Sequence, residues 1–144
     1  MKYTSIIDLN LPIEKVIELF DNPDNMYQWQ PELTNFEHLS GDPGQPGAKS
    51  KLTYQNGKRT VEMTETVLVR ELPEEFSGTY EMKGVINHIN NSFETLADGK
   101  TRWTVISDFQ FSGIMGFLSI FMKGMFKKQT MTFMQRFKDF AENT

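Results

Sequence analysis

The spacing of apolar residues near the C-terminus predicts a long amphipathic helix over residues 112–144. The apolar residues there recur at helical intervals and share one face: Leu118, Met122, Met125, Phe126, Phe133, Phe137 and Phe140. Lys123, Lys127 and Lys138 fall on the opposite side. Ser112 is the expected N-cap, because a serine hydroxyl can accept a hydrogen bond from an unpaired backbone N–H. So large an apolar face needs an apolar surface to cover it.

Alternating apolar and polar positions predict strands through the rest of the chain. We expect a first strand over residues 3–9 and about six more over residues 33–39, 49–55, 58–70, 76–83, 85–96 and 101–111. Asn56-Gly57 and Ala97–Lys100 mark two hairpin turns. Two short helices, over residues 11–20 and 24–30, separate the first strand from the second.

The order of these elements predicts an α+β fold in a single domain, residues 1–144. Strands joined by short turns pair antiparallel, and a sheet with one apolar face must bury that face. The C-terminal helix is the element able to cover it. We therefore expect a strongly curved antiparallel β-sheet of about six to seven strands, wrapped around the long C-terminal α-helix.

Composition excludes several classes of protein. The net charge of −4 is unlike a nucleic-acid-binding domain, which is strongly basic. The chain has no cysteine, and its two histidines, His38 and His88, have no second ligand at metal-binding spacing, so we expect no metal site and no cofactor. Residues 113–122 form the longest uncharged apolar stretch, which is too short for a membrane span. The N-terminus has no signal-peptide pattern, which predicts a cytoplasmic protein without integral membrane association.

Two polar residues fall on apolar faces and are candidates for ligand contact. Glu65 is in phase with Met63 on its strand, and a carboxyl group facing an apolar interior would have a raised pKa. The alternative is an irregularity that returns Glu65 to water. Gln129 lies on the apolar stripe of the C-terminal helix, where it would bind either a ligand or a backbone group. Twelve Phe and nine Met suit an adaptable interior, although core packing alone would also explain them. The other candidates are Trp29, Tyr80, Phe93, Trp103, Phe109, Met122, Met125 and Phe126.

The arrangement resembles the START-like superfamily, also called SRPBCC, which includes the birch-pollen-allergen-like helix-grip proteins. The resemblance spans the chain and lies in residues 11–20 with Asp21-Asn22-Pro23, Met26 and Trp29, in the loop 41–47, in residues 98–101 and in the final helix. It implies a helix-grip fold with a deep cavity between sheet and final helix. The superfamily includes lipid and steroid carriers, polyketide cyclases and chaperone activators. These share no catalytic motif, so the resemblance assigns no catalytic residue.

Three functions follow as hypotheses. The first is binding of a small hydrophobic or amphipathic molecule in the cavity. The second is an enzyme of the polyketide cyclase or dehydratase kind, with Glu65 as acid or base. The third is a protein-interaction domain like the chaperone activators. No catalytic motif is visible, and the sequence leaves the ligand and the oligomeric state open.

The C-terminal helix itself is expected to have two parts. Phe133, Phe137 and Phe140 predict a rigid core, whereas Met122 and Met125 predict looser packing beside a cavity. Gly124 predicts a close backbone approach or a bend in the first half of the helix, and we expect Gly124→Leu to destabilise the protein by clashing with its neighbours.

Overall fold

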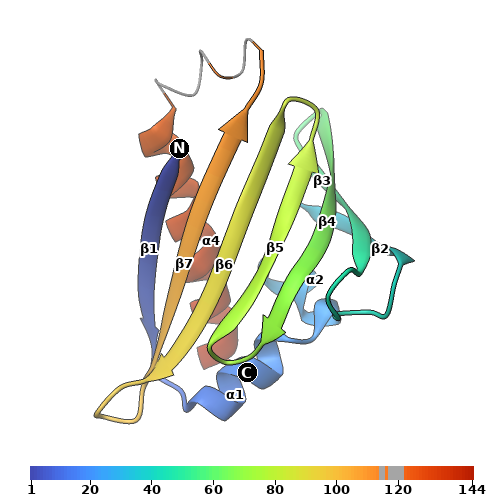
Figure 1. Ribbon diagram of the computed structural model, residues 1–144. Coiled ribbons are helices and arrows are strands. Elements are labelled where there is room, and N and C mark those ends of the chain that lie inside the picture. The colour runs from blue at the N-terminus through green and yellow to red at the C-terminus, as the bar shows by residue number, and fades with distance from the viewer. Residues whose placement is uncertain (114–115, 117–121) are drawn as a thin grey trace.

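Seven antiparallel strands form one curved sheet in the order β1-β7-β6-β5-β4-β3-β2 (Figure 1). The computed structural model describes residues 1–113, 116 and 122–144. The strands are β1 (Lys2–Leu9), β2 (Leu33–Ser40), β3 (Lys49–Asn56), β4 (Arg59–Glu71), β5 (Glu75–Met82), β6 (Val85–Thr95) and β7 (Thr101–Phe111). Strands β2 to β7 follow one another as neighbours, and β1 pairs with β7. The predicted fold class is confirmed.

Glycines form the two predicted hairpin turns. Gly57, between β3 and β4, has φ of 64°, and Gly99, between β6 and β7, has φ of 84°. Residues with a Cβ rarely adopt such angles, so glycine lets the chain reverse here without strain.

A third glycine lies inside β5, where the sheet bends. Gly78 pairs with Val67 of β4, and the pairing register shifts between Val67 and Val69. A Cβ on Gly78 would lie 2.7 Å from the carbonyl oxygen of Thr66. A bulge bends its strand, and glycine allows the two backbones to approach closely. Both features help the sheet to curve.

Helices cover the concave face of the sheet (Figure 1). They are α1 (Ile13–Phe20), the 3-10 turn η1 (Pro23–Asn25), α2 (Met26–Trp29) and α4 (Lys123–Glu142). Helix α4 lies along the sheet and contacts β1 at one edge and α2 towards the other.

Polar contacts hold α4 along its length. At the β1 edge, the hydroxyls of Tyr3 and Thr130 are 2.8 Å apart, and Lys138 Nζ donates to the carbonyl of Asp8 at 2.7 Å. On the other side, the Arg136 guanidinium forms a salt bridge with Glu32 at 3.0 Å. The helix therefore bridges the sheet from one side to the other.

The C-terminal helix begins later than the sequence predicts. Gly113 has φ of 60°, outside the right-handed helical region, and Met122 is the N-cap residue of α4. A single helix from Ser112 is therefore wrong. The part of the prediction that covers residues 114–115 and 117–121, including Leu118, lies outside the described residues.

The hydrophobic core lies where α1, α2 and the C-terminal half of α4 meet the sheet. Its largest fully buried side chains are Trp103 and Phe137, whose rings are 5.2 Å apart. Phe137 also packs edge-on against Trp29 at 5.1 Å. The cluster consists of Leu9, Val16, Leu19, Trp29, Phe93, Trp103, Val105, Met134, Phe137 and Ala141.

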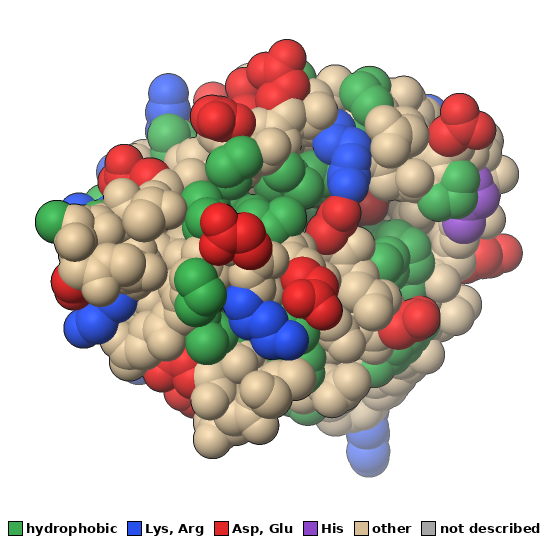
Figure 2. Space-filling model, turned by 90° about the horizontal axis from the view of Figure 1, so that it is seen from below, with side chains coloured by type: hydrophobic (Ala, Val, Ile, Leu, Met, Phe, Trp, Pro, Cys, Tyr) green, Lys and Arg blue, Asp and Glu red, His purple; other side chains and the backbone are tan. Residues whose placement is uncertain are grey.

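The surface carries mixed charges. Figure 2 shows acidic and basic side chains interspersed over the face that it presents, with hydrophobic side chains between them. Within the described part of the chain, no helix is both long and apolar enough to cross a membrane.

Candidate functional site

A cavity of about 510 Å³ lies between the concave face of the sheet and α4. Every strand contributes side chains to its wall, and α2 and α4 close it from the other side. Its lining includes the exposed residues Pro23, His38 and Pro43, so the cavity reaches the surface beside η1 and the β2–β3 loop. Most of the lining is apolar, and a few polar side chains stand out within it.

Strand alternation explains which side chains reach the cavity. Met63, Glu65 and Val67 occupy alternate positions of β4 and all face inward. Val105, Ser107 and Phe109 do the same on β7. Glu65 and Met63 therefore share the inward face of β4, the phase that the sequence indicates.

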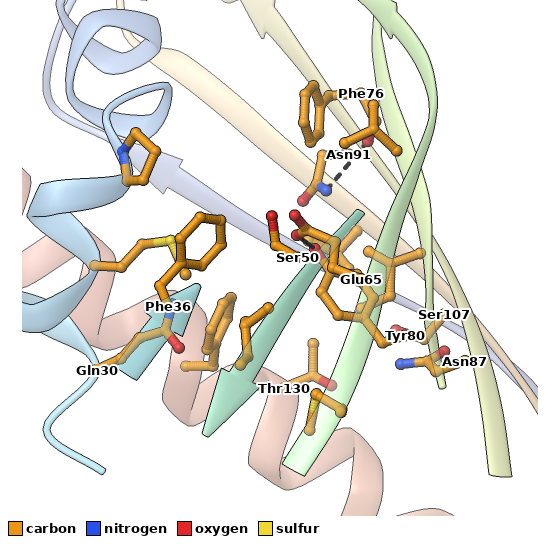
Figure 3. Close-up of a pocket in the computed structure, with 18 of the residues that line it drawn as sticks. Gln30, Phe36, Ser50, Glu65, Phe76, Tyr80, Asn87, Asn91, Ser107 and Thr130 are labelled. Atoms are coloured by element: carbon orange, nitrogen blue, oxygen red, sulfur yellow. Dashed lines mark hydrogen bonds between the residues drawn. The ribbon is translucent and has the colours of Figure 1, made fainter. Parts of the chain in front are cut away.

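Four polar side chains form a row across the sheet, here called the polar row: Ser50, Glu65, Tyr80 and Asn87. They occupy directly paired positions, because Ser50 is opposite Glu65, Glu65 is opposite Tyr80, and Tyr80 is opposite Asn87. All four line the cavity. Figure 3 shows Ser50, Glu65 and Tyr80 close together. The Tyr80 hydroxyl donates to Glu65 Oε2 at 2.6 Å.

Burial governs the acid–base behaviour of this row. It raises the pKa of Glu65 above its ordinary value of 4.5, and the hydrogen bond from Tyr80 offsets part of that rise. Burial and the nearby Glu65 carboxylate raise the pKa of Tyr80 well above its usual range. Glu65 is therefore a carboxyl group that holds its proton to a higher pH than an exposed glutamate does.

A second polar pair lies at the α2 end of the cavity. The Tyr54 hydroxyl donates to Gln30 Oε1 at 2.7 Å, and Gln30 is 5% exposed. Burial is the main cause that raises the pKa of Tyr54, followed by the charges of Glu65 and Glu32. Tyr54 therefore remains a neutral hydrogen-bond donor over the physiological pH range.

Two asparagines of β6 line the cavity, and they differ in whether their side-chain amides have hydrogen-bond partners. Asn91 is satisfied, because its Oδ1 accepts from Trp103 Nε1 at 3.0 Å and its Nδ2 donates to the Phe76 carbonyl at 3.2 Å. The buried Oδ1 of Asn87 has no hydrogen-bond partner among the described residues.

Most of the cavity residues expected from the sequence do line it: Trp29, Met63, Glu65, Tyr80, Phe109, Phe126 and Gln129. Of these, Gln129 is exposed and lies at the rim. The expected alternative that Glu65 returns to water is wrong, because β4 continues regularly through that position.

Four expected residues lie elsewhere. Phe93 and Trp103 face inward but are buried in the core beneath α1, with rings 5.8 Å apart. Met125 is 46% exposed, and Met122 lies at the N-cap of α4 outside the cavity lining. The rotation of α4 is the cause, since it turns Phe126, Thr130 and Phe133 towards the cavity instead.

Sequence reasoning missed several polar lining residues: Gln30, Ser50, Asn87, Asn91 and Thr130. Strand phase could have found Ser50, two positions before the apolar Leu52 of β3. Strand phase could not predict which side chains of β6 face inward, because four polar residues among positions 87–91 obscure the alternation.

The His88 side chain is exposed. No group of three or more His, Cys, Asp or Glu side chains in the described residues is placed to hold a metal ion.

Comparisons with known proteins agree with this architecture. A search of curated proteins finds no significant match. Among solved structures, Ara h 8.0201 aligns with a TM-score of 0.78 at 14% identity, covering 100% of this chain and 99% of its own. The Zhui aromatase/cyclase from Streptomyces sp. R1128 aligns with a TM-score of 0.80 at 12% identity, covering 99% and 93%. A conserved protein from Geobacillus kaustophilus gives 0.80 at 15% identity, covering 99% and 96%.

At such low identities these structures establish the fold, and the family rests on the sequence. The family model described as "Polyketide cyclase / dehydrase and lipid transport" matches residues 1–142. Together with the helix-grip architecture, this match confirms the resemblance seen in the sequence. The chain belongs to the polyketide cyclase/dehydrase and lipid-transport family of the START-like superfamily.

Proposed function

We propose that the protein binds a small apolar or amphipathic molecule in the cavity between the sheet and α4. The observation that carries this proposal is the cavity itself, whose volume of about 510 Å³ falls within the range of small-molecule sites. Its wall is mainly hydrocarbon and aromatic, with the polar row placed to orient one polar group of the ligand. The same proposal places the protein in the cytoplasm, where such a carrier shields an apolar molecule from water.

The family and one structural neighbour support the proposal by analogy. The family description names lipid transport beside polyketide cyclisation and dehydration. The Streptomyces neighbour is named an aromatase/cyclase. Both activities need an apolar guest to be enclosed, which is what this cavity offers.

A ligand panel tests the proposal directly. Fatty acids, steroids and aromatic compounds are added separately, and the thermal unfolding temperature is measured. A ligand at about 100 times its Kd should stabilise the folded protein by about 2.7 kcal/mol. The proposal is wrong if no compound raises the unfolding temperature at high concentration.

Two tryptophan variants of β4 locate the binding. Met63→Trp places a large ring in the cavity and should abolish the stabilisation by ligand, because the guest loses its space. Leu68→Trp is the matched control, since Leu68 is 43% exposed. A ligand response in folded Met63→Trp protein as large as in Leu68→Trp protein would show that binding occurs outside the cavity.

The Glu65–Tyr80 contact favours an enzyme as a second candidate. A carboxyl group with a raised pKa, hydrogen-bonded inside a cavity, is suited to transfer a proton to or from a bound substrate. In a cyclase or dehydratase of this kind, Glu65→Gln should abolish turnover of a polyketide-like substrate and leave the circular dichroism spectrum unchanged. Turnover at the wild-type rate in this variant would exclude Glu65 as the acid or base.

A further inference from the structure

The cavity contains a carboxyl group that has no cationic partner. Two carboxyl groups line the cavity, Asp21 and Glu65, and Asp21 is paired with Arg70 at 2.8 Å. No Lys or Arg lines the cavity in the described residues, and residues 114–121 contain no charged residue by sequence. His38 is the sole other titratable lining residue apart from tyrosines, and it is exposed at the rim.

The neighbours of Glu65 offer hydrogen bonds but no compensating charge. Across β4, Ser50 stands on one side and Tyr80 on the other, and Tyr80 donates the one hydrogen bond that Glu65 accepts in the described residues. A buried charge in a protein is normally paired, because loss of hydration must be offset by an opposite charge. An ionised Glu65 therefore lacks the partner that a buried carboxylate requires.

We propose that the cavity prefers an amphiphile whose polar group is a protonated amine, held by Glu65 with its hydrocarbon part against the apolar wall. This inference rests on the proposed function and names its ligand class. An ammonium group supplies three donors and the missing positive charge. The apolar wall, which includes Trp29, Phe36 and Phe126, accommodates the hydrocarbon part. A ligand carboxylate would find no cation among the described lining residues, and it would disfavour the ionised form of Glu65 that an ammonium group stabilises.

Three single-chain probes of equal length test the preference: dodecylamine, dodecanol and dodecanoate. Each probe is titrated into protein carrying the neutral dye Nile red, at neutral pH and below the concentration at which the probe forms micelles. Displacement of the dye gives the affinity of the probe. We expect dodecylamine to bind at least about tenfold more tightly than dodecanol, and dodecanoate to bind most weakly. Equal or tighter binding of dodecanoate by the wild-type protein would overturn the inference without any variant.

Variants of β4 assign the preference to one side chain. Glu65→Gln should weaken dodecylamine binding by about tenfold and change dodecanol binding by less than about threefold. The control is Glu62→Gln, because Glu62 is exposed on the same strand, and it should change neither affinity. An unchanged amine affinity in Glu65→Gln overturns the inference but leaves cavity binding intact. If none of the three probes displaces the dye and no compound of the ligand panel raises the unfolding temperature, the proposed function is overturned as well.

Discussion

Asn87 and Asn91 both face inward on β6, on either side of the inward-facing Ile89, and they differ in whether their amides are satisfied. Asn91 has two hydrogen-bond partners, including the fully buried Trp103, whereas the Asn87 Oδ1 has none in the described part of the chain. A buried polar group without a partner costs stability, and so does removal of one partner from a satisfied pair. The same substitution at these two positions therefore has opposite consequences.

Leucine at each position measures this difference. Asn87→Leu should leave the free energy of unfolding unchanged or raise it by up to about 1 kcal/mol, since an unsatisfied acceptor is replaced by a side chain of similar size. Asn91→Leu should lower it by about 1–3 kcal/mol, because Trp103 Nε1 loses its acceptor. Urea denaturation of the two variants checks this. Equal losses would show that Asn87 is satisfied in solution.

Glu65 links the stability of the protein to pH. Its pKa is raised in the folded state by burial, so the folded protein keeps a proton that the unfolded chain releases near pH 4.5. Above that pH the folded state binds more protons than the unfolded state, and wild-type stability falls as pH rises through the raised pKa.

Glutamine at position 65 removes this dependence. The stability of Glu65→Gln relative to wild type should increase as pH rises from about 4.5, and level off above the raised pKa of Glu65. Urea melts across this range measure the difference, with Glu62→Gln as an exposed control on the same strand. A constant difference between Glu65→Gln and wild type would mean that Glu65 titrates like an exposed carboxyl.

Strand phase offered the inward orientation of Glu65 as one of two alternatives, and it did not reveal the polar row around it. The inward orientation holds because no bulge interrupts β4 at that position, which the pattern of a single strand does not show. The row depends on the registers of three strand pairs, β3–β4, β4–β5 and β5–β6, which together place Ser50 and Asn87 beside the Glu65–Tyr80 pair. Register is a property of pairing, and a single strand's pattern does not contain it.

At the scale of elements, two glycines have opposite surroundings. Gly78 of β5 is buried against β4, and an added Cβ would lie 2.7 Å from the Thr66 carbonyl oxygen. Gly124 of α4 is exposed, and an added Cβ would meet nothing within 4 Å. The expectation that Gly124 marks a close backbone approach is therefore wrong. Helical spacing alone did not fix the rotation of α4 about its axis.

Substitution of Gly78 and of Gly124 by alanine tests whether each glycine is needed for close packing. Gly78→Ala should destabilise the protein by about 1–3 kcal/mol, because the strands must move apart at the bulge. Gly124→Ala should be neutral or stabilise it by about 0.5 kcal/mol through helix propensity. Thermal unfolding of the pair gives the comparison. Tolerance of Gly78→Ala would show that the bend between β4 and β5 does not depend on this close approach.

At the scale of the whole molecule, the fold has a solid end and a hollow end. Met134, Phe137 and Ala141 in the C-terminal half of α4 are fully buried in the core. The part of α4 that ends at Phe133 borders the cavity through Phe126, Thr130 and Phe133. The predicted division of this helix into two parts is present, but its boundary differs from the expected one. Phe133, expected in the rigid core, is 38% exposed and lines the cavity.

Removal of one phenylalanine from each half should therefore have different effects. Phe137→Ala deletes a fully buried ring that contacts Trp29 and Trp103, and should cost about 3–5 kcal/mol of stability. Phe126→Ala deletes a half-buried ring stacked on Phe109 at 4.9 Å, and should cost about 2 kcal/mol or less. Because Phe126 forms part of the cavity wall, its loss should weaken Nile red binding severalfold, whereas folded Phe137→Ala protein should bind the dye nearly as wild type does. Urea melts and dye titrations at a temperature where both variants are folded measure the two effects. Equal losses of stability with unchanged dye binding in Phe126→Ala would mean that the hollow end is packed as tightly as the core.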